Sequence, residues 1–401
     1  MIADFILGII TYNRYDYLDD LLNTLQDQSI LPKEIIISDN GIGYTLKKNI
    51  NIPVTIIKNA YNYGTCRALN QIIKIASGQT IMFICDDIYF TSNDSLKSIY
   101  DKFNKNLKED NIHLIWCNHW AAFIASPAWI EKTGYFDENI WPCYFEDSDM
   151  VERIRKKQNN NISHNCIGFK SVRMINNFEE TEVLGNKRGT AEPLITTKFS
   201  DFKDRNLFYF LYKWKNTFNL NEDMHLNTKH FYVEQSDVDL FDFERQYLNN
   251  QISSVNIHNP QNNAVGFFDE IIDLKKYNIQ NIIEYKTDRA YISRILLHLK
   301  PLQFTTIRDE PQLQHDILHH LNYLFNYKIN IIFKDSKILD DINYENYDLL
   351  VLNNQQVPSN IKDIKYILYF SNNDNLIISN YKKTIIKKNV NNTYMIFFEK
   401  I

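Results

Sequence analysis

Short apolar runs alternate with amphipathic segments along the first 90 residues. Leucines at positions 18, 21, 22 and 25 recur at helical spacing within Asp16–Gln28, and a second helix is predicted around Thr65–Ile75. The apolar runs around these helices predict four strands, at Phe5–Thr11, Glu34–Ser38, Val54–Lys58 and Thr80–Cys85. Strands joined by crossover helices indicate a doubly wound α/β sheet.

Polar motifs follow three of these strands. Thr11–Arg14, Asp39–Gly41 and Asp86–Asp87 each lie where a predicted strand ends. Ligands of open α/β sheets bind at the carboxyl ends of the strands. We therefore expect these three motifs to converge on one crevice.

The adjacent acids Asp86 and Asp87 end a buried strand. Hard divalent cations such as Mg²⁺ and Mn²⁺ prefer oxygen ligands and keep part of their coordination for phosphate oxygens. The pair therefore suits a metal-bound diphosphate. A simple polar turn is the alternative, because Asp is common in turns.

A further acidic motif opens a predicted helix. Phe145–Asp149 contains Glu146, Asp147 and Asp149, and basic residues follow towards the end of the helix. Helix capping is one explanation, because acids at a helix N-terminus complement its dipole. The aromatic run Leu207–Trp214 predicts a buried helix in preference to an oligomer contact or an interfacial patch.

The last third of the chain has an α/β rhythm of its own. We expect a first domain over residues 1–248, with a helical extension from about 200, and a polar linker at 249–263. A smaller Rossmann-like α/β domain follows at 264–401, and its last two strands predict an antiparallel hairpin that completes a mostly parallel sheet.

Composition excludes several classes of protein. The 401 residues carry a net charge of −5, which disfavours broad nucleic-acid binding. The five cysteines form no CxxC pair, so neither a zinc knuckle nor a disulfide framework is indicated. With no basic leader and no transmembrane segment evident, we expect a cytoplasmic protein, in the host cytoplasm if it is viral. A homo-oligomer is compatible with the sequence.

The motifs form an ordered series that resembles family 2 glycosyltransferases of the GT-A fold over about the first 215 residues. Gly134–Glu138 and Tyr212–Trp214 are similar to segments on the acceptor side of rhamnosyltransferase-like members. The series consists of Thr11–Arg14, Ser38–Gly41, Asn62–Arg67 with Gly78, Asp86–Asp87, and Glu146–Asp149 with Arg153.

The resemblance implies a role for each residue of the donor site. Asp87 is the direct ligand of a Mn²⁺ or Mg²⁺ ion, and Asp86 lies beside the ribose or a metal-bound water. Asp39 accepts a hydrogen bond from the imide of uracil or thymine, which implies a UDP- or dTDP-sugar. The other assigned donor-site residues are Thr11, Tyr12, Arg14 and Arg67, of which Tyr12 packs on the base and Arg67 contacts the base or the diphosphate.

The resemblance also implies an inverting transfer to a hydroxyl of a glycan or glycoconjugate, as in polysaccharide biosynthesis. Asp147 is then the general base that removes the proton of the attacking hydroxyl, and Glu146 helps to hold the acceptor. Asp149 is assigned to capping or structure. The acceptor depends on the loops around Cys117–Ala125 and Gly134–Tyr144.

Two features depart from the family pattern. Cys85 replaces the first of three acids that members often carry at the metal strand. A further metal-ligating His often follows the acidic helix, but no His lies within Ser171–Glu182, and His164 has the wrong register. A scaffold that binds nucleotide sugars without catalysis is therefore one alternative. A nucleotidyltransferase is another, but the first strand is not followed by a glycine-rich phosphate loop.

The C-terminal domain resembles a degenerate class I methyltransferase in the order of its strands and helices. The stretch Glu284–Ala290 has Lys286 and Ala290 where the family has glycines, and Arg308 precedes Asp309 where an acid is expected. Side chains at those positions would crowd a cofactor. We expect a non-catalytic module for acceptor binding, dimerisation or stabilisation; a bifunctional enzyme with a divergent methyltransferase is the alternative.

Overall fold

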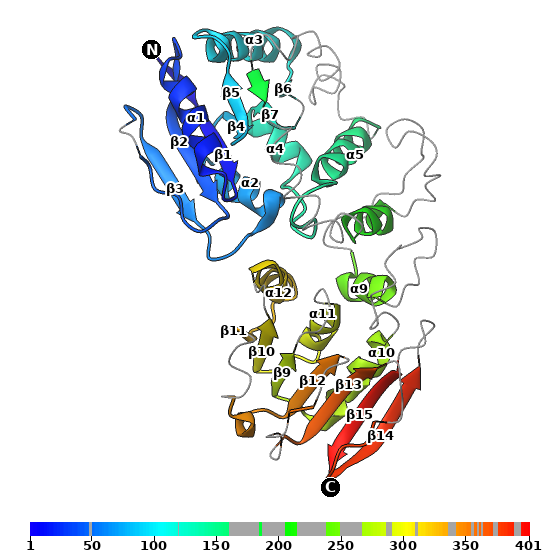
Figure 1. Ribbon diagram of the computed structural model, residues 1–401. Coiled ribbons are helices and arrows are strands. Elements are labelled where there is room, and N and C mark those ends of the chain that lie inside the picture. The colour runs from blue at the N-terminus through cyan, green and yellow to red at the C-terminus, as the bar shows by residue number, and fades with distance from the viewer. Residues whose placement is uncertain are drawn as a thin grey trace. The chain divides into compact units, whose positions relative to one another are not determined.

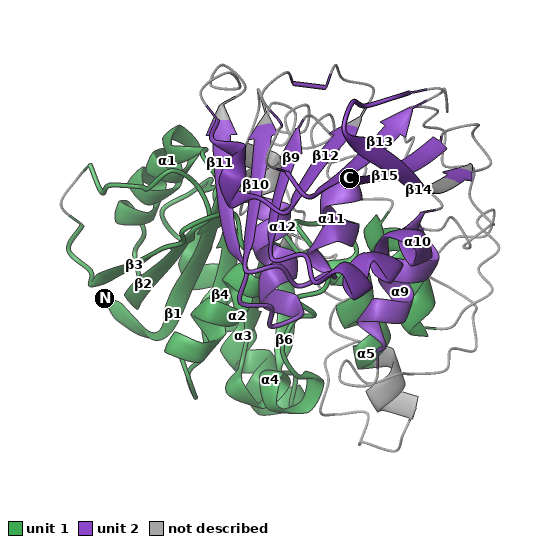
Figure 2. Cartoon of the chain, turned by 90° about the horizontal axis from the view of Figure 1, so that it is seen from below, with its two compact units in different colours: residues 1–236 green, residues 237–401 purple. Residues whose placement is uncertain are grey.

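The computed structural model divides the chain into two compact units, residues 1–236 and 237–401 (Figures 1 and 2). It describes residues 1–47, 50–118, 120–159, 184–186, 205–214, 238–248, 267–285, 291–308, 312–335, 342–353, 357–358, 361, 364–371, 376–388 and 394–401. The predicted linker, 249–263, and the region around His164 and Ser171–Glu182 lie outside the described residues.

Unit 1 is built on a six-stranded mixed sheet in the order β3-β2-β1-β4-β7-β6. The first four strands in this order are parallel, whereas β7 runs antiparallel to both β4 and β6. The strands are β1 (Ile2–Thr11), β2 (Leu31–Asp39), β3 (Val54–Lys58), β4 (Ile81–Cys85), β6 (Leu114–Asn118) and β7 (Ala122–Ala125). The predicted doubly wound α/β sheet is thus confirmed, with an antiparallel edge.

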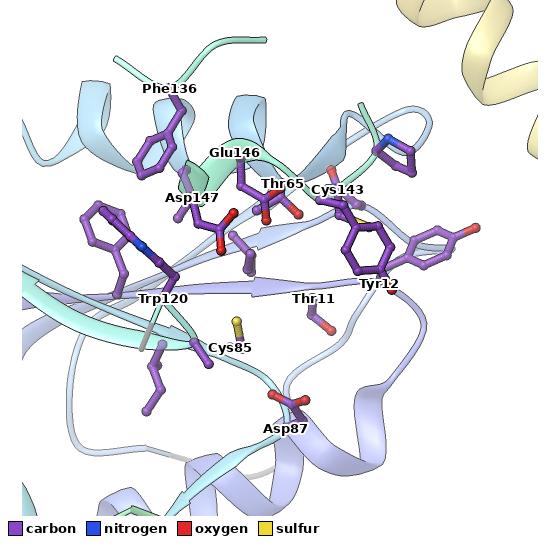
Figure 3. Close-up of a pocket in the computed structure, with 18 of the residues that line it drawn as sticks. Thr11, Tyr12, Thr65, Cys85, Asp87, Trp120, Phe136, Cys143, Glu146 and Asp147 are labelled. Carbon is purple, nitrogen blue, oxygen red and sulfur yellow. The ribbon is translucent and has the colours of Figure 1, made fainter. Parts of the chain in front are cut away.

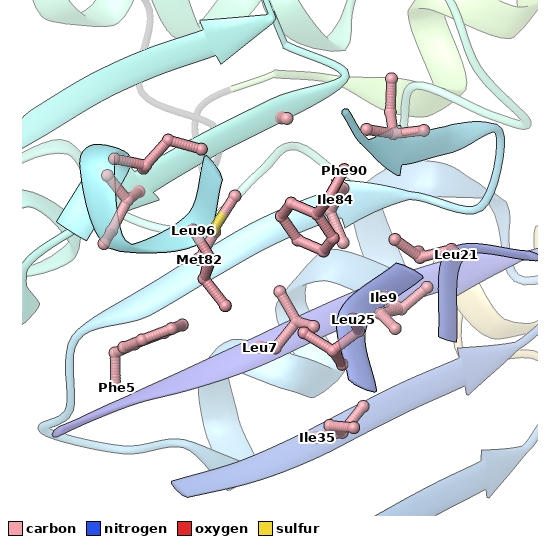
Figure 4. Packing of buried hydrophobic residues seen from close by; sticks show 14 of the residues in the cluster. Phe5, Leu7, Ile9, Leu21, Leu25, Ile35, Met82, Ile84, Phe90 and Leu96 are labelled. Carbon is pink, nitrogen blue, oxygen red and sulfur yellow. The ribbon is translucent and has the colours of Figure 1, made fainter. Parts of the chain in front are cut away.

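The helices of unit 1 pack through apolar stripes. Figure 4 shows Leu21 and Leu25 of the first helix beside Leu7 and Ile9 of β1, and all four side chains are buried. Each such burial contributes about 1.5–3 kcal/mol. The named helices are α1 (Tyr15–Gln26), α2 (Gly64–Ile75), α3 (Ser95–Asp110), α4 (Pro127–Thr133) and α5 (Glu146–Asn159). Residues 205–214 form a further helix. A short β5 (Ile88–Phe90) pairs antiparallel with β8 (Leu184–Asn186).

Strand register brings the polar motifs of unit 1 to one edge. Thr11 pairs with Asp39 across β1 and β2, and Ile10 pairs with Cys85 across β1 and β4. Because β1, β2 and β4 are parallel, the loops that follow them start side by side. The convergence expected from the sequence therefore holds for the backbone of all three motifs.

Unit 2 contains a seven-stranded sheet in the order β11-β10-β9-β12-β13-β15-β14. Its last strand along the chain, β15, inserts antiparallel between β13 and β14, and the other pairs are parallel. The predicted hairpin is confirmed. The strands are β9 (Asn281–Tyr285), β10 (Gln303–Arg308), β11 (Asn330–Asp335), β12 (Leu349–Asn353), β13 (Tyr366–Ser371), β14 (Tyr381–Lys388) and β15 (Tyr394–Lys400).

Four helices and two 3₁₀ turns accompany this sheet in the described part of unit 2. They are α9 (Leu240–Leu248), α10 (Phe268–Ile272), η3 (Asp273–Tyr277), α11 (Tyr291–Leu297), α12 (Gln312–Leu324) and η6 (Tyr344–Asn346). The helix α9 belongs to unit 2, whereas the sequence analysis assigned residues up to 248 to the first domain. None of the helices within the described ranges is both long enough and apolar enough to cross a bilayer.

Candidate active site

A cavity of about 450 Å³ opens at the carboxyl ends of β1 and β4. Figure 3 shows Asp87 on one side of it and the pair Glu146 and Asp147 on another. The predicted site residues that line it are Thr11, Tyr12, Arg14, Asp87, Glu146 and Asp147. Tertiary structure therefore unites the donor motifs with the acidic helix, which lies some 60 residues further along the chain.

Asp86 is fully buried beneath the cavity. Its Oδ2 accepts a 2.7 Å hydrogen bond from the Thr11 hydroxyl, and its Oδ1 contacts Nη2 of Arg14. Burial raises the pKa of Asp86 to about 7, against the opposing effect of Arg14 and Thr11. Both oxygens of Asp86 are thus occupied, which suits a residue that positions Thr11 and Arg14.

Asp87 presents one uncommitted oxygen. Its Oδ2 lies 3.5 Å from Nη1 of Arg14, whereas its buried Oδ1 accepts no hydrogen bond from any described residue. A buried carboxylate oxygen without a donor is costly unless something positive reaches it. Asp87 therefore fits a direct metal ligand and Asp86 does not.

Protein ligands beyond Asp87 are sparse. Within the part of the chain that the structure describes, no three His, Cys, Asp or Glu side chains cluster closely enough to hold a metal ion. Cys85 and Asp87 both line the cavity. A cation here would depend on substrate and water oxygens for much of its coordination, as is common for Mg²⁺ at phosphate sites.

The acidic pair opens α5 after a strained turn. Tyr144 and Phe145 have φ values of 73° and 74°, which bulky residues rarely adopt and which cluster at functional sites. Oδ1 of Asp147 accepts a 2.7 Å hydrogen bond from the Ser148 amide, so this residue also supports the helix start. Its side chain still lines the cavity, so the capping and catalytic interpretations are compatible.

The Glu146 side chain is half-buried, and one of its carboxylate oxygens is fully enclosed. Its Oε2 has no hydrogen-bond partner among the described residues. Burial, followed by the charge of Asp147, raises the pKa of Glu146 to about 8. At neutral pH this side chain is therefore mostly a neutral acid that can donate a hydrogen bond into the cavity.

A buried ionic cluster holds α5 in place. Asp149 accepts hydrogen bonds from Arg153 and Trp214, and Lys213 contacts both Asp149 and Asp137 at 2.7 Å. The structural role expected for Asp149 agrees with this arrangement, and residues 208–210 and 214 are buried as predicted. The roles of Lys213 and Asp137 were missed, although a lone lysine in the aromatic run 207–214 was a signal for a buried ion pair.

Asp39 ends β2, as the sequence indicated, and its carboxylate is engaged within the protein. It is fully buried and does not line the cavity. Its Oδ1 accepts hydrogen bonds from the Tyr15 hydroxyl at 3.0 Å and the Gly41 amide at 2.8 Å, and its Oδ2 contacts the Tyr44 amide. An Asp in this environment orders the turn after β2, and its oxygens are already committed to donors within the protein.

Arg67 likewise lies away from the cavity wall. Its guanidinium stacks 3.7 Å from the centre of the Tyr63 ring, and Nη1 donates a 3.3 Å hydrogen bond to the Tyr61 hydroxyl. The family resemblance implied a contact of Arg67 with the base or the diphosphate. Its side chain instead packs on the aromatic pair that precedes the helix.

Aromatic side chains that the sequence analysis did not single out form an apolar wall. Trp120, Phe123 and Phe136 line the cavity, and Trp120 packs edge-on against both phenylalanines. They belong to the two loops expected to govern the acceptor. Amphipathic surfaces such as the faces of sugar rings pack well on rings of this kind.

The candidate cofactor turn of unit 2 lies outside the described residues, at 286–290. Glu284, which precedes it, is buried, and its carboxylate accepts a 2.6 Å hydrogen bond from the Ser293 hydroxyl. The strands of unit 2, numbered along the chain, follow the order 3-2-1-4-5-7-6. This order places the first strand next to the second and the fourth, as in a doubly wound sheet.

Comparisons with known proteins find a family match within unit 1. Residues 7–174 match the family model of glycosyl transferase family 2. An uncharacterized glycosyltransferase of Bacillus subtilis strain 168, YwdF, is 38% identical over 86 residues, which is 21% of this chain and 32% of that protein. The chain thus matches about a third of the length of this curated relative.

Solved structures with partial likeness to this chain include a mannosyltransferase and TarS. The mannosyltransferase PcManGT from Pyrobaculum calidifontis, in complex with GDP-Man and Mn²⁺, is 14% identical with a TM-score of 0.30, and the match covers 38% of this chain and 51% of that one. Residues 1–349 of TarS from S. aureus are 16% identical with a TM-score of 0.32, covering 52% and 80%. These scores establish no shared fold over the whole chain, but the family match is direct. The N-terminal part of this chain, over residues 7–174, is thus similar to glycosyl transferase family 2.

Proposed function

We propose that the protein is an inverting, metal-dependent glycosyltransferase that moves a sugar from a UDP- or dTDP-sugar to a hydroxyl of a glycan or glycoconjugate. One observation carries this proposal. Asp87 and Arg14, which suit a diphosphate, share a single cavity with Asp147, which suits a base. A scaffold without catalysis would not need both ends of such a cavity, in which Asp87 and Glu146 each have an oxygen without a partner among the described residues.

The donor end of the cavity is built from the loop after β1 and the end of β4. Tyr12 lines it and offers a ring for the nucleobase, and Arg14 offers a guanidinium fork that matches phosphate oxygens. Asp39 supports this end indirectly through Tyr15 and Gly41. A bound Mn²⁺ or Mg²⁺ would supply charge neutralisation of the leaving diphosphate. Asp87 is the residue that would hold it.

The acceptor end is built from α5 and the aromatic wall. Asp147 removes the proton of the acceptor hydroxyl as the hydroxyl oxygen attacks the anomeric carbon. The bond from that carbon to the diphosphate oxygen breaks, and its electron pair leaves with the nucleoside diphosphate. Glu146, in its neutral form, donates a hydrogen bond to the acceptor and keeps a second negative charge away from Asp147.

Unit 2 enters this proposal as a non-catalytic module. Lys286 and Ala290 still stand where a methyltransferase cofactor needs glycine. We propose that the unit contributes acceptor binding, dimerisation or stability. Binding of S-adenosylmethionine in a calorimetric titration would instead support the bifunctional alternative.

A donor screen tests the proposed function. UDP-, dTDP- and GDP-sugars would be added with Mn²⁺, and thermal stabilisation and slow donor hydrolysis would be measured for wild type and Asp87→Asn. We expect stabilisation by one donor class, lost in Asp87→Asn. Asp101→Asn, an exposed acid on α3, is the matched control and should behave as wild type. No response to any nucleotide sugar, with or without Mn²⁺, would refute the proposal.

A further inference from the structure

Arg14 spans the two acids at the end of β4. Nη2 contacts Oδ1 of Asp86, and Nη1 lies 3.5 Å from Oδ2 of Asp87. The Arg14 side chain is 24% exposed and lines the cavity together with Asp87, so it can be reached from the cavity. The guanidinium therefore lies beside the carboxylate that a cation would bind.

The loop that carries Arg14 is fixed by its neighbours. Asn13 adopts the left-handed conformation at φ 58°, and its Oδ1 accepts a 2.9 Å hydrogen bond from the Ile42 amide. A Cβ at Gly41 would lie 2.2 Å from that same oxygen, so the two loops are in close contact. A defined turn thus holds the backbone of Arg14 beside the two acids.

We propose that Arg14 is the built-in counter-ion of Asp86 and Asp87, that it competes with a divalent cation for Asp87, and that the donor diphosphate relieves this competition by taking over the guanidinium. The inference rests on the proposed function, which it deepens by coupling the metal to the donor.

Electrostatics supports each part of the proposal. A guanidinium and a divalent cation repel each other, and the repulsion is screened less in a partly buried site than in bulk water. A diphosphate offers bidentate acceptors to Arg14, whose contact with Asp87 is long at 3.5 Å, although its contact with Asp86 is close. Free metal is therefore disfavoured, whereas metal and diphosphate favour each other's binding by the same factor, as linkage requires.

Direct metal titration tests the competition. Mn²⁺ binding would be followed by the loss of its free-ion electron paramagnetic resonance signal, with and without UDP, in wild type and Arg14→Gln. We expect Arg14→Gln to bind Mn²⁺ without UDP at least about 10-fold more tightly, and UDP to tighten Mn²⁺ binding far more in wild type than in the variant. Lys33→Gln removes the same charge near the start of β2 and should match wild type.

A second variant protects the test against misfolding. Arg14→Gln leaves buried Asp86 without its cation, so the double variant Arg14→Gln/Asp86→Asn removes charge and partner together while keeping an acceptor for Thr11. Equal Mn²⁺ affinity in wild type and both variants, including no binding by any of them, overturns the inference. If wild type bound no UDP but the variants gained Mn²⁺ affinity, the competition between Arg14 and the cation would be supported. The release of Arg14 by the diphosphate, and with it the proposed function, would be refuted.

Discussion

The ammonium group of Lys213 lies 2.7 Å from Oδ1 of Asp149, and both side chains are almost completely buried. Lys213 also reaches Oδ2 of Asp137 at 2.7 Å. One cation thereby joins the helix at 205–214 to α5 and to the segment before it. Because α5 begins with Glu146 and Asp147, this contact positions the acids of the cavity.

Replacing Lys213 by Met should therefore destabilise unit 1. The change keeps the apolar stem but leaves buried Asp137 without its cation and Asp149 with Arg153 as its remaining cation, which costs about 3–5 kcal/mol. All five tryptophans lie in unit 1, so their fluorescence during urea unfolding reports on that unit. Lys97→Met, which breaks an exposed pair on α3, should change the free energy of unfolding far less, because water screens the charges of an exposed pair. Equal losses of unfolding free energy in the two variants would mean that the buried cluster stabilises unit 1 no more than an exposed ion pair does.

The variant Asp147→Asn should lose turnover while keeping the donor. Asn retains the oxygen that accepts the Ser148 amide but cannot take a proton, so kcat should fall by about 10²–10⁴-fold. The Kd for UDP, measured calorimetrically with Mn²⁺, should stay within about twofold of wild type, because Asp147 lies at the acceptor end. Turnover at the wild-type rate would remove Asp147 from the role of base.

Stability should depend on pH through Glu146. Its folded-state pKa of about 8 lies above the ordinary value of 4.5, so the folded protein holds this proton more tightly than the unfolded chain. The resulting stabilisation is complete below the ordinary pKa and is lost as the pH rises through about 8. Relative to Glu146→Gln, the free energy of unfolding of wild type should fall by about 2–4 kcal/mol between pH 5 and 9. Parallel pH profiles of the two proteins would show that Glu146 is ionised throughout.

The variant Gly41→Ala should weaken donor binding without touching the donor. The new Cβ would meet the Asn13 side-chain oxygen at 2.2 Å and its backbone nitrogen at 2.8 Å, which displaces the loop that carries Tyr12 and Arg14. A shift of that loop should raise the Kd for UDP at least about 10-fold. Gly78→Ala is the control, because its φ of 75° strains the backbone in open space. It should lower the melting temperature and leave UDP affinity unchanged; an effect of equal size on affinity would argue against the loop contact.

Much of the architecture was readable from local patterns. The four parallel strands of unit 1, the antiparallel hairpin of unit 2 and the meeting of Thr11 with Asp86 follow from apolar periodicity and from the rule that parallel strands share a carboxyl edge. Such features depend on residues close in sequence or on the topology of whole strands. A single sequence carries both kinds of information.

The pairing of individual side chains was not readable in this way. Asp39 ends β2 and Arg67 lies in the first turn of α2, both of which were expected elements. The sequence did not show that Asp39 accepts a hydrogen bond from Tyr15, or that Arg67 stacks on Tyr63. The same holds for Arg14 on Asp86 and for Lys213 on Asp149, partners that are 72 and 64 residues apart. Register and periodicity bring a backbone to an edge, but the rotamers and neighbours that satisfy each buried charge emerge only when the whole unit packs.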